Sequence, residues 1–156
     1  GLIVAARQKV EDDTGRCLMT QTWLQYFDEF PSGDELELAY APVQSITSVT
    51  YKKSDATSST FAAADYDLDA AAVPPVIRLG YNEIWPTDTL YPTNPVTVTF
   101  VAGYLDASEI PAPLIHAMKL LLTHWYENRE DSVIAATAAT IPLGSAAILL
   151  AWVRHD

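Results

Sequence analysis

The sequence predicts an α+β fold, in which a mainly antiparallel β-sheet subdomain near residues 19–103 is inserted into a small helical bundle. Two observations predict it. Apolar residues recur at helical spacing near both ends of the chain, whereas the middle alternates apolar and polar residues and is rich in Thr, Val, Ile and Tyr. No helical pattern separates the predicted strands, so the sheet should be largely antiparallel. The length fits a single domain spanning residues 1–156.

The N-terminal helix is predicted from one apolar face and from its end. The face consists of Leu2, Ile3, Ala6 and Val10. Gly15 follows the last polar turn, where a helix C-terminus favours a residue that tolerates positive φ. Because no N-terminal capping residue precedes the helix, we expect further residues upstream of it.

The predicted strands share alternation and β-branched or aromatic residues. They are the segments TQTWLQYF, ELELAY, ITSVTYK, PVIRL and VTVTFVAG. Turn-forming stretches separate them, namely PSGD, KSDATSS, GYNE and WPTDTLYPTNP. We expect the apolar alternating positions of these strands to face the core.

Two further helices are predicted after Gly103. The long one, near residues 111–130, has prolines in its first turn and one broad apolar stripe, made of Leu114, Ile115, Met118, Leu121, Leu122 and Trp125. The short one begins near residue 142 and runs to the C-terminus. Between them, the Ala- and Thr-rich residues 132–142 are expected to form a connector or a weak helix.

Composition limits the classes of function. The chain has 9 basic and 20 acidic residues, a net charge of −11, which disfavours binding of nucleic-acid phosphates through a basic patch. Cys17 is the one cysteine, so an internal disulfide and a cysteine-based metal cluster are excluded, and we expect its thiol to be buried. Because no apolar run reaches the length of a membrane span, no membrane partner is expected.

The segment HWYENRED, residues 124–131, has the composition of a catalytic or metal site. His124 and Glu127 are three apart, as in the ligand pairs of di-iron bundles, but such sites need a second pair and two more glutamates on neighbouring helices. Trp125 and Arg129 are four apart, so the guanidinium can stack on the indole at the helix end. We therefore interpret this segment as helix-end packing and expect no enzyme activity and no cofactor.

A second motif imitates a calcium loop. DYDLD places Asp65, Asp67 and Asp69 at alternating positions, but the EF-hand pattern then requires Gly and Glu where Ala70 and Val76 stand. We interpret it as a solvated strand edge and expect no metal site. His116 and His155 have no partner close in sequence and are expected at the surface.

A series of motifs resembles the head–tail connector (adaptor, or head completion) proteins of tailed phages, a family that includes the gene transfer agent adaptors. The motifs follow the family's order along almost the whole chain: AARQKVEDDTGRCLMTQTW, FPSGDELELAYAPVQSITSVTY, DYDLD, Trp85-Pro86, VTVTFVAGY, HWYENRE and PLGSAAILLAWVR. No single motif is diagnostic, but their shared order is difficult to produce by chance. Family members usually carry a further segment before the first helix, whereas this sequence opens on that helix.

The resemblance implies a structural virion component rather than an enzyme. Such a protein would form a homo-oligomeric ring, a dodecamer by analogy, in the neck between capsid and tail, after assembly in the host cytoplasm. Its partners would be the portal protein and a tail-side neck protein, either a stopper or a tail terminator. Double-stranded DNA would pass through the ring without specific binding, and an acidic lining would let the duplex slide.

Two alternatives from other classes stay open. One is a small acidic β-rich binding module that recognises a carbohydrate or a peptide. The other is a hydrolase that uses His124 and Glu127.

The C-terminal segment is the predicted portal or partner contact. It is strongly apolar in a position where chains are usually polar and frayed. Tryptophan and arginine are also frequent interface anchors. The predicted contact residues are Ile148, Leu149, Leu150, Trp152, Val153 and Arg154. The alternative is that the segment simply completes the helical core.

Overall fold

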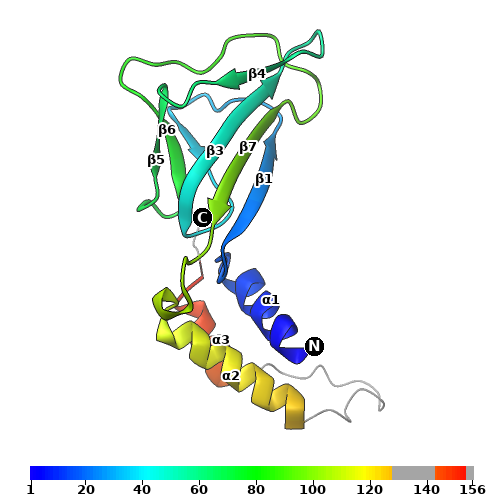
Figure 1. Cartoon of the computed structure of the whole chain (residues 1–156), viewed down its shortest axis with the longest axis vertical. Coiled ribbons are helices and arrows are strands. Elements are labelled where there is room, and N and C mark those ends of the chain that lie inside the picture. Colours follow the sequence, from blue (N-terminus) through cyan, green and yellow to red (C-terminus); the bar gives the residue numbers. More distant parts are fainter. Residues whose placement is uncertain (128–142, 154–156) are drawn as a thin grey trace.

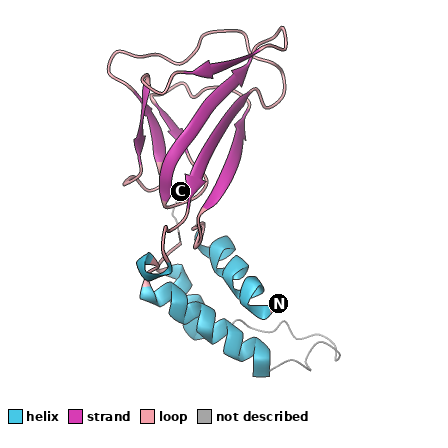
Figure 2. Cartoon of the chain, in the orientation of Figure 1, coloured by secondary structure: helices cyan, strands magenta, loops and turns pink. Residues whose placement is uncertain are grey.

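The computed structural model describes residues 1–127 and 143–153. Over these residues the chain forms α-helices at both ends with strands between them, so the predicted α+β class is confirmed (Figures 1 and 2). The elements, in chain order, are α1 (Leu2–Thr14), β1 (Gln21–Phe27), β2 (Glu35–Glu37), β3 (Val43–Lys52), β4 (Ser58–Phe61), β5 (Tyr66–Asp69), β6 (Val76–Leu79), β7 (Val96–Ala102), the 3-10 helix η1 (Ala107–Glu109), α2 (Ala112–Glu127) and α3 (Leu143–Leu150).

The described strands form two antiparallel sheets rather than the one that was predicted. The larger sheet has the order β1-β7-β3-β4 and the smaller has the order β2-β6-β5. β4 was missed because its first two residues, Ser58 and Ser59, belong to KSDATSS, the stretch that was predicted to be a turn. The predicted strand edge at DYDLD is confirmed, since β5 is an outer strand of the smaller sheet.

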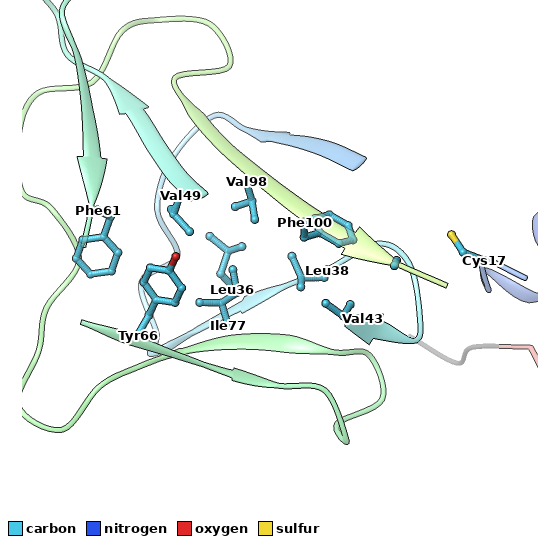
Figure 3. Packing of buried hydrophobic residues seen from close by; sticks show 11 residues of the cluster. Cys17, Leu36, Leu38, Val43, Val49, Phe61, Tyr66, Ile77, Val98 and Phe100 are labelled. Atoms are coloured by element: carbon cyan, nitrogen blue, oxygen red, sulfur yellow. The ribbon is translucent and has the colours of Figure 1, made fainter. Parts of the chain in front are cut away.

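The two sheets face each other across a hydrophobic core (Figure 3). β7 supplies Val98 and Phe100, which alternate with outward-facing threonines, as the sequence predicted. From the smaller sheet and the residue after β2 come Leu36, Leu38 and Ile77, all nearly inaccessible. The smaller sheet is thus required to bury the inner face of the larger one.

An aromatic cluster covers one end of this core. Phe30 stacks on Trp85 with ring centroids 5.3 Å apart, and Phe61 lies 5.5 Å from the same indole. The Trp85 Nε1–H donates to the carbonyl of Gly33 at 2.7 Å, which satisfies its polar atom. The loop between β6 and β7 is thereby attached to the loop before β2.

A second hydrophobic cluster holds the three described helices together below the sheets (Figure 1). Its buried members are Ala6, Val10, Leu18, Leu114, Ala117, Leu121 and Leu149. The predicted stripe of the long helix is confirmed at Leu114 and Leu121, which are fully buried. The predicted face of α1 is confirmed at Ala6 and Val10 but wrong at Ile3, because Ile3 lines an open groove beside the last turns of α2.

The end of α1 follows the predicted chemistry. Gly15 adopts the left-handed conformation, with φ of 64°, and its N–H donates to the carbonyl of Glu11. The buried Thr14 hydroxyl donates to the carbonyl of Val10 at 2.7 Å, so it is not left unsatisfied. The chain can therefore turn sharply from the helices toward β1.

Leu121→Ala should create a cavity in the helical cluster, since this side chain is fully buried between the helices. We expect the free energy of unfolding to fall by about 2–5 kcal/mol, measured by urea denaturation. Leu105→Ala, at a side chain that is 76% exposed, is the matched control and should change it little. Equal stability of the two variants would contradict the described packing.

Candidate interaction surfaces

The net charge of the chain is concentrated in the β part, meaning the sheets together with the loops that connect their strands. Residues 19–103 contain eleven acidic and three basic residues, whereas residues 1–18 contain three of each. The β part therefore carries most of the net charge of −11. Like charges repel, so the acidic surfaces of this part disfavour contact with another acidic molecule more than its uncharged surfaces do.

The outer face of the smaller sheet is acidic. Cross-strand partners place Glu35, Arg78 and Asp67 side by side, with Glu37 and Asp69 at the next level. Arg78 pairs with Glu35 at 3.0 Å and with Asp69 at 3.3 Å, so two of the four carboxylates share one cation. These pairs are about half exposed and contribute little to stability.

Asp69 of the acidic DYDLD motif thus makes its contacts within the chain. Asp69 also accepts hydrogen bonds from the N–H groups of Ala71 and Ala72, at 3.2 and 3.1 Å, in the turn after β5. Within residues 1–127 and 143–153, no group of three or more His, Cys, Asp or Glu residues is arranged to hold a metal ion.

The outer face of the larger sheet differs sharply. Its side chains alternate with the buried ones of β7, and the strand register aligns them in three successive rungs. We call this surface the uncharged sheet face; its residues are Thr22, Leu24, Tyr26, Ser45, Ser48, Thr50, Thr97, Thr99 and Val101. None of these nine residues is charged, although Lys52 follows Thr50 on the same side of β3; Leu24 and Tyr26 are 53% and 55% exposed.

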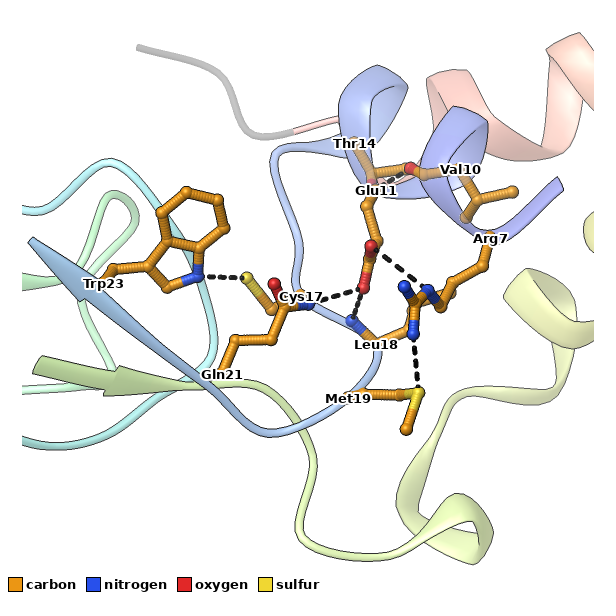
Figure 4. Close-up of polar contacts among 9 residues, drawn as sticks. All are labelled: Arg7, Val10, Glu11, Thr14, Cys17, Leu18, Met19, Gln21 and Trp23. Carbon is orange, nitrogen blue, oxygen red and sulfur yellow. Dashed lines mark hydrogen bonds and ion pairs between the residues drawn. The ribbon is translucent and has the colours of Figure 1, made fainter. Parts of the chain in front are cut away.

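A polar network joins the helices to the sheets (Figure 4). The carboxylate of Glu11, on α1, accepts from the backbone N–H of Leu18 at 2.8 Å and from the side-chain amide of Gln21 at 3.1 Å. Arg7 lies 3.6 Å away, measured from its Nε to the other carboxylate oxygen. The Glu11 side chain therefore binds both the link between α1 and β1, residues 15–20, and the first residue of β1.

Cys17 lies in the same link and is buried, as predicted. The indole Nε1–H of Trp23 donates to its sulfur at 3.2 Å. Burial raises the pKa of the Cys17 thiol to about 11, because the charged thiolate would lose its hydration; the hydrogen bond from Trp23 partly opposes this effect. A neutral, buried thiol is a structural group rather than a nucleophile.

The C-terminal helix packs against its own chain. Leu149 is only 2% exposed, and Ile148 and Trp152 are partly buried in the helical cluster. Arg16 holds the end of the segment: its guanidinium lies 5.4 Å from the centre of the Trp152 ring, and its Nε donates to the Trp152 carbonyl at 3.3 Å. For Leu149, the structure therefore agrees with the alternative of a segment that completes the core.

Other predicted contact residues remain accessible beyond this packing. Leu150 is 68% exposed, and it lines a shallow hollow with Asp13, Leu149 and Val153. Arg154 lies outside the described residues. A partner contact through Leu150 and Val153 stays a prediction.

The first four residues of the HWYENRED segment, 124–127, form the end of α2, as predicted, and residues 128–131 lie outside the described residues. His124 and Trp125 are half-buried and Glu127 is exposed. Arg129 lies outside the described residues, so its predicted stacking on Trp125 stays a prediction, and the same holds for His155 and the connector at residues 132–142. His116 is exposed, as expected.

Sequence reasoning missed a groove beside this helix end. It has a volume of about 380 Å³ and is lined by Leu2, Ile3, Leu122, Thr123, Tyr126 and Glu127. The residues come from the first turn of α1 and the last turns of α2, which are far apart in the sequence. Their apolar side chains read as ordinary helix faces when each helix is considered alone.

Within residues 1–127 and 143–153, no helix has both the length and the apolar character needed to cross a membrane.

Comparison with known proteins gives a likeness of fold. A chain in a structure of the neck of a native GTA particle, computed with C12 symmetry, matches with a TM-score of 0.80 and 24% identity over 99% of this chain and 81% of that chain. A chain in the virion of a native gene transfer agent (GTA) particle matches with a TM-score of 0.77, 24% identity and coverage of 99% and 76%. A chain in the neck of an empty GTA particle, computed with C6 symmetry, gives 0.78, 24%, 99% and 77%.

This likeness confirms the fold that the sequence resemblance implied. It extends through the helices and both sheets, because it covers nearly the whole chain. No protein-family model matches the sequence, and no curated protein gives a significant match.

The buried thiol predicts low reactivity. Cys17 should resist iodoacetamide in the folded protein at mildly alkaline pH and react fully in concentrated urea. The free energy of unfolding should also fall as pH rises from 9.0 toward about 11, because the folded state retains the proton that the unfolded state releases. Cys17→Ala should remove this part of the pH dependence. Rapid alkylation of the folded protein would contradict the described burial.

Proposed function

We propose that this chain is a structural component of a particle neck: a ring-forming head–tail adaptor. The observation that carries the proposal is the likeness of its fold, over 99% of the chain, to chains from solved necks of gene transfer agent particles. The ordered motifs in the sequence support the same family. Each copy would occupy one position of a closed ring, and twelve copies are expected because the first of these necks was computed with C12 symmetry.

The adaptor would join the portal protein to a tail-side neck protein and continue the DNA channel. An acidic chain suits this role, because like charge keeps the phosphate backbone from adhering to the wall. The acidic face of the smaller sheet provides such charge at Glu35, Glu37, Asp67 and Asp69. DNA would pass through the ring without specific contacts.

The end of α3 is the proposed attachment point for the portal. Leu149 and Trp152 anchor the segment to the helices, so its position is defined by the chain itself. Leu150 then presents an apolar side chain to solvent, where a hydrophobic socket on a partner could accept it. The attachment would be a docked surface rather than a free arm.

The role is structural rather than catalytic. The thiol of Cys17 is buried and neutral, and Glu127 is exposed at the end of α2. His124 and Glu127 would take part in the packing and solvation of a helix end. The hydrolase alternative would instead require His124 and Glu127 to act in catalysis.

Native mass spectrometry of the purified chain tests the ring. We expect closed oligomers, centred on twelve copies, either for the protein alone or in a complex with purified portal. A chain that stays monomeric both alone and with portal would contradict the proposal and favour the small acidic binding module.

Leu150→Glu tests the attachment point. A charge at this exposed apolar position should weaken co-sedimentation with portal by about tenfold or more, because the carboxylate would lose hydration in the contact. Leu105→Glu, at a similarly exposed leucine outside α3, is the matched control and should bind normally. If Leu150→Glu also binds normally while retaining its fold by circular dichroism, the end of α3 is not the portal contact.

A further inference from the structure

We infer that the uncharged sheet face is a contact between neighbouring copies of this chain, and this inference rests on the proposed ring. The binding partner is therefore a second copy of the chain, and the large side chains buried in the contact would be Leu24 and Tyr26 on β1. Three independent features of the described sheets support the assignment: the distribution of charge, the composition of the edge strands, and the exposure of large side chains.

Charge decides which faces can meet. Every copy carries a net charge of −11, so two copies repel each other at most orientations. Contact across the smaller sheet would bury or crowd four carboxylates, of which two pair with Arg78, and burying an unpaired carboxylate is costly. Contact across the uncharged sheet face desolvates hydroxyl and apolar groups instead, so it avoids that cost.

The edge strands differ in the same direction. Natural proteins commonly place charges on exposed edge strands, because such charges prevent pairing with another chain. Both edge strands of the smaller sheet follow this rule, with Glu35 and Glu37 on β2 and Asp67 and Asp69 on β5. β1, an edge of the larger sheet, reads QTWLQYF and contains no charged residue. The charged residues that commonly prevent an edge strand from associating with another chain are therefore absent from β1, the strand that carries Leu24 and Tyr26 of the uncharged sheet face.

The side chains of β1 separate into two sets. Inward, Trp23 stacks on Tyr40, and Gln25 bonds to the Glu37 carbonyl at 3.1 Å and to the Ala39 N–H at 2.8 Å, so these groups are satisfied within the chain. Outward, Leu24 and Tyr26 are more than half exposed. Tyrosine is enriched at protein interfaces because it combines a large apolar ring with a polar tip.

A ring determines the kind of contact. Closed cyclic rings require a head-to-tail interface, in which two different patches of the same chain meet. The uncharged sheet face would be one of these patches, repeated once per copy. Threonines and serines around Leu24 and Tyr26 give it hydroxyl groups that can pair with backbone or side-chain groups of the adjoining copy.

Tyr26→Glu tests the assignment against Tyr81→Glu. Both tyrosines are exposed, at 55% and 94%, but Tyr81 lies in the loop after β6 and outside the uncharged sheet face. We expect Tyr26→Glu to raise the concentration needed for oligomer formation by about tenfold or more, with an unchanged circular dichroism spectrum. Tyr81→Glu should assemble like the wild type. Normal assembly of Tyr26→Glu would overturn the inference.

A photo-crosslinking experiment covers the case in which Tyr26→Glu fails to fold. The photoreactive amino acid p-benzoylphenylalanine at position 26 should give covalent dimers in assembled wild-type-like oligomers, whereas the same group at position 81 should not. Oligomers without crosslinks at position 26 would overturn the inference and leave the ring intact. A wild type that never oligomerises would instead overturn the ring, and with it this contact.

Discussion

The pairing of β1 with β7 is the constraint on which the rest of the structure depends. Gln21 at the start of β1 lies opposite Ala102 at the end of β7, so the chain enters and leaves the larger sheet at the same place. α1 precedes that entry and α2 follows that exit, which brings two distant helices together below the sheets. A helical cluster can then form from both ends of the chain.

The segments just before β1 and just after β7 cross at very close range. Gly103 has a φ of 114°, and a Cβ at this position would lie 2.1 Å from the carbonyl oxygen of Met19. Gln44 spans the crossing, since its side-chain amide donates to the Gly103 carbonyl at 2.7 Å and to the Thr20 hydroxyl at 3.0 Å. Together with the hydrogen bonds of Glu11, these contacts make the helices and sheets a connected unit despite their separate hydrophobic clusters.

The two parts differ in charge, and this difference suits the adaptor role that we propose. Residues 1–18 are balanced in charge, whereas the sheets and their connecting loops carry most of the negative charge, and the four strand carboxylates all lie on the smaller sheet. An acidic face can remain hydrated beside DNA, while an uncharged face can be buried at lower cost. The C-terminal helix adds a third surface, whose anchor residues are buried in the chain and whose last leucine is exposed.

The sequence by itself determined the local choices. Period and composition identified the helices and most strands, Gly15 marked the end of α1, and the stripe of α2 predicted the burial of Leu114 and Leu121. The order of the motifs also implied the fold that the neck chains share. These predictions succeed because helical spacing, strand alternation and turn chemistry depend on residues that are near each other in the chain.

Tertiary structure alone decided which surfaces result. The division into two sheets, the groove at Ile3 and the burial of Leu149 all depend on contacts between distant segments. The sequence likewise did not distinguish Leu24 and Tyr26, because alternation assigns residues to a face without showing whether another sheet covers it. The smaller sheet covers one face of the larger sheet and leaves the uncharged sheet face open, since only the inner face is apolar enough to exclude water.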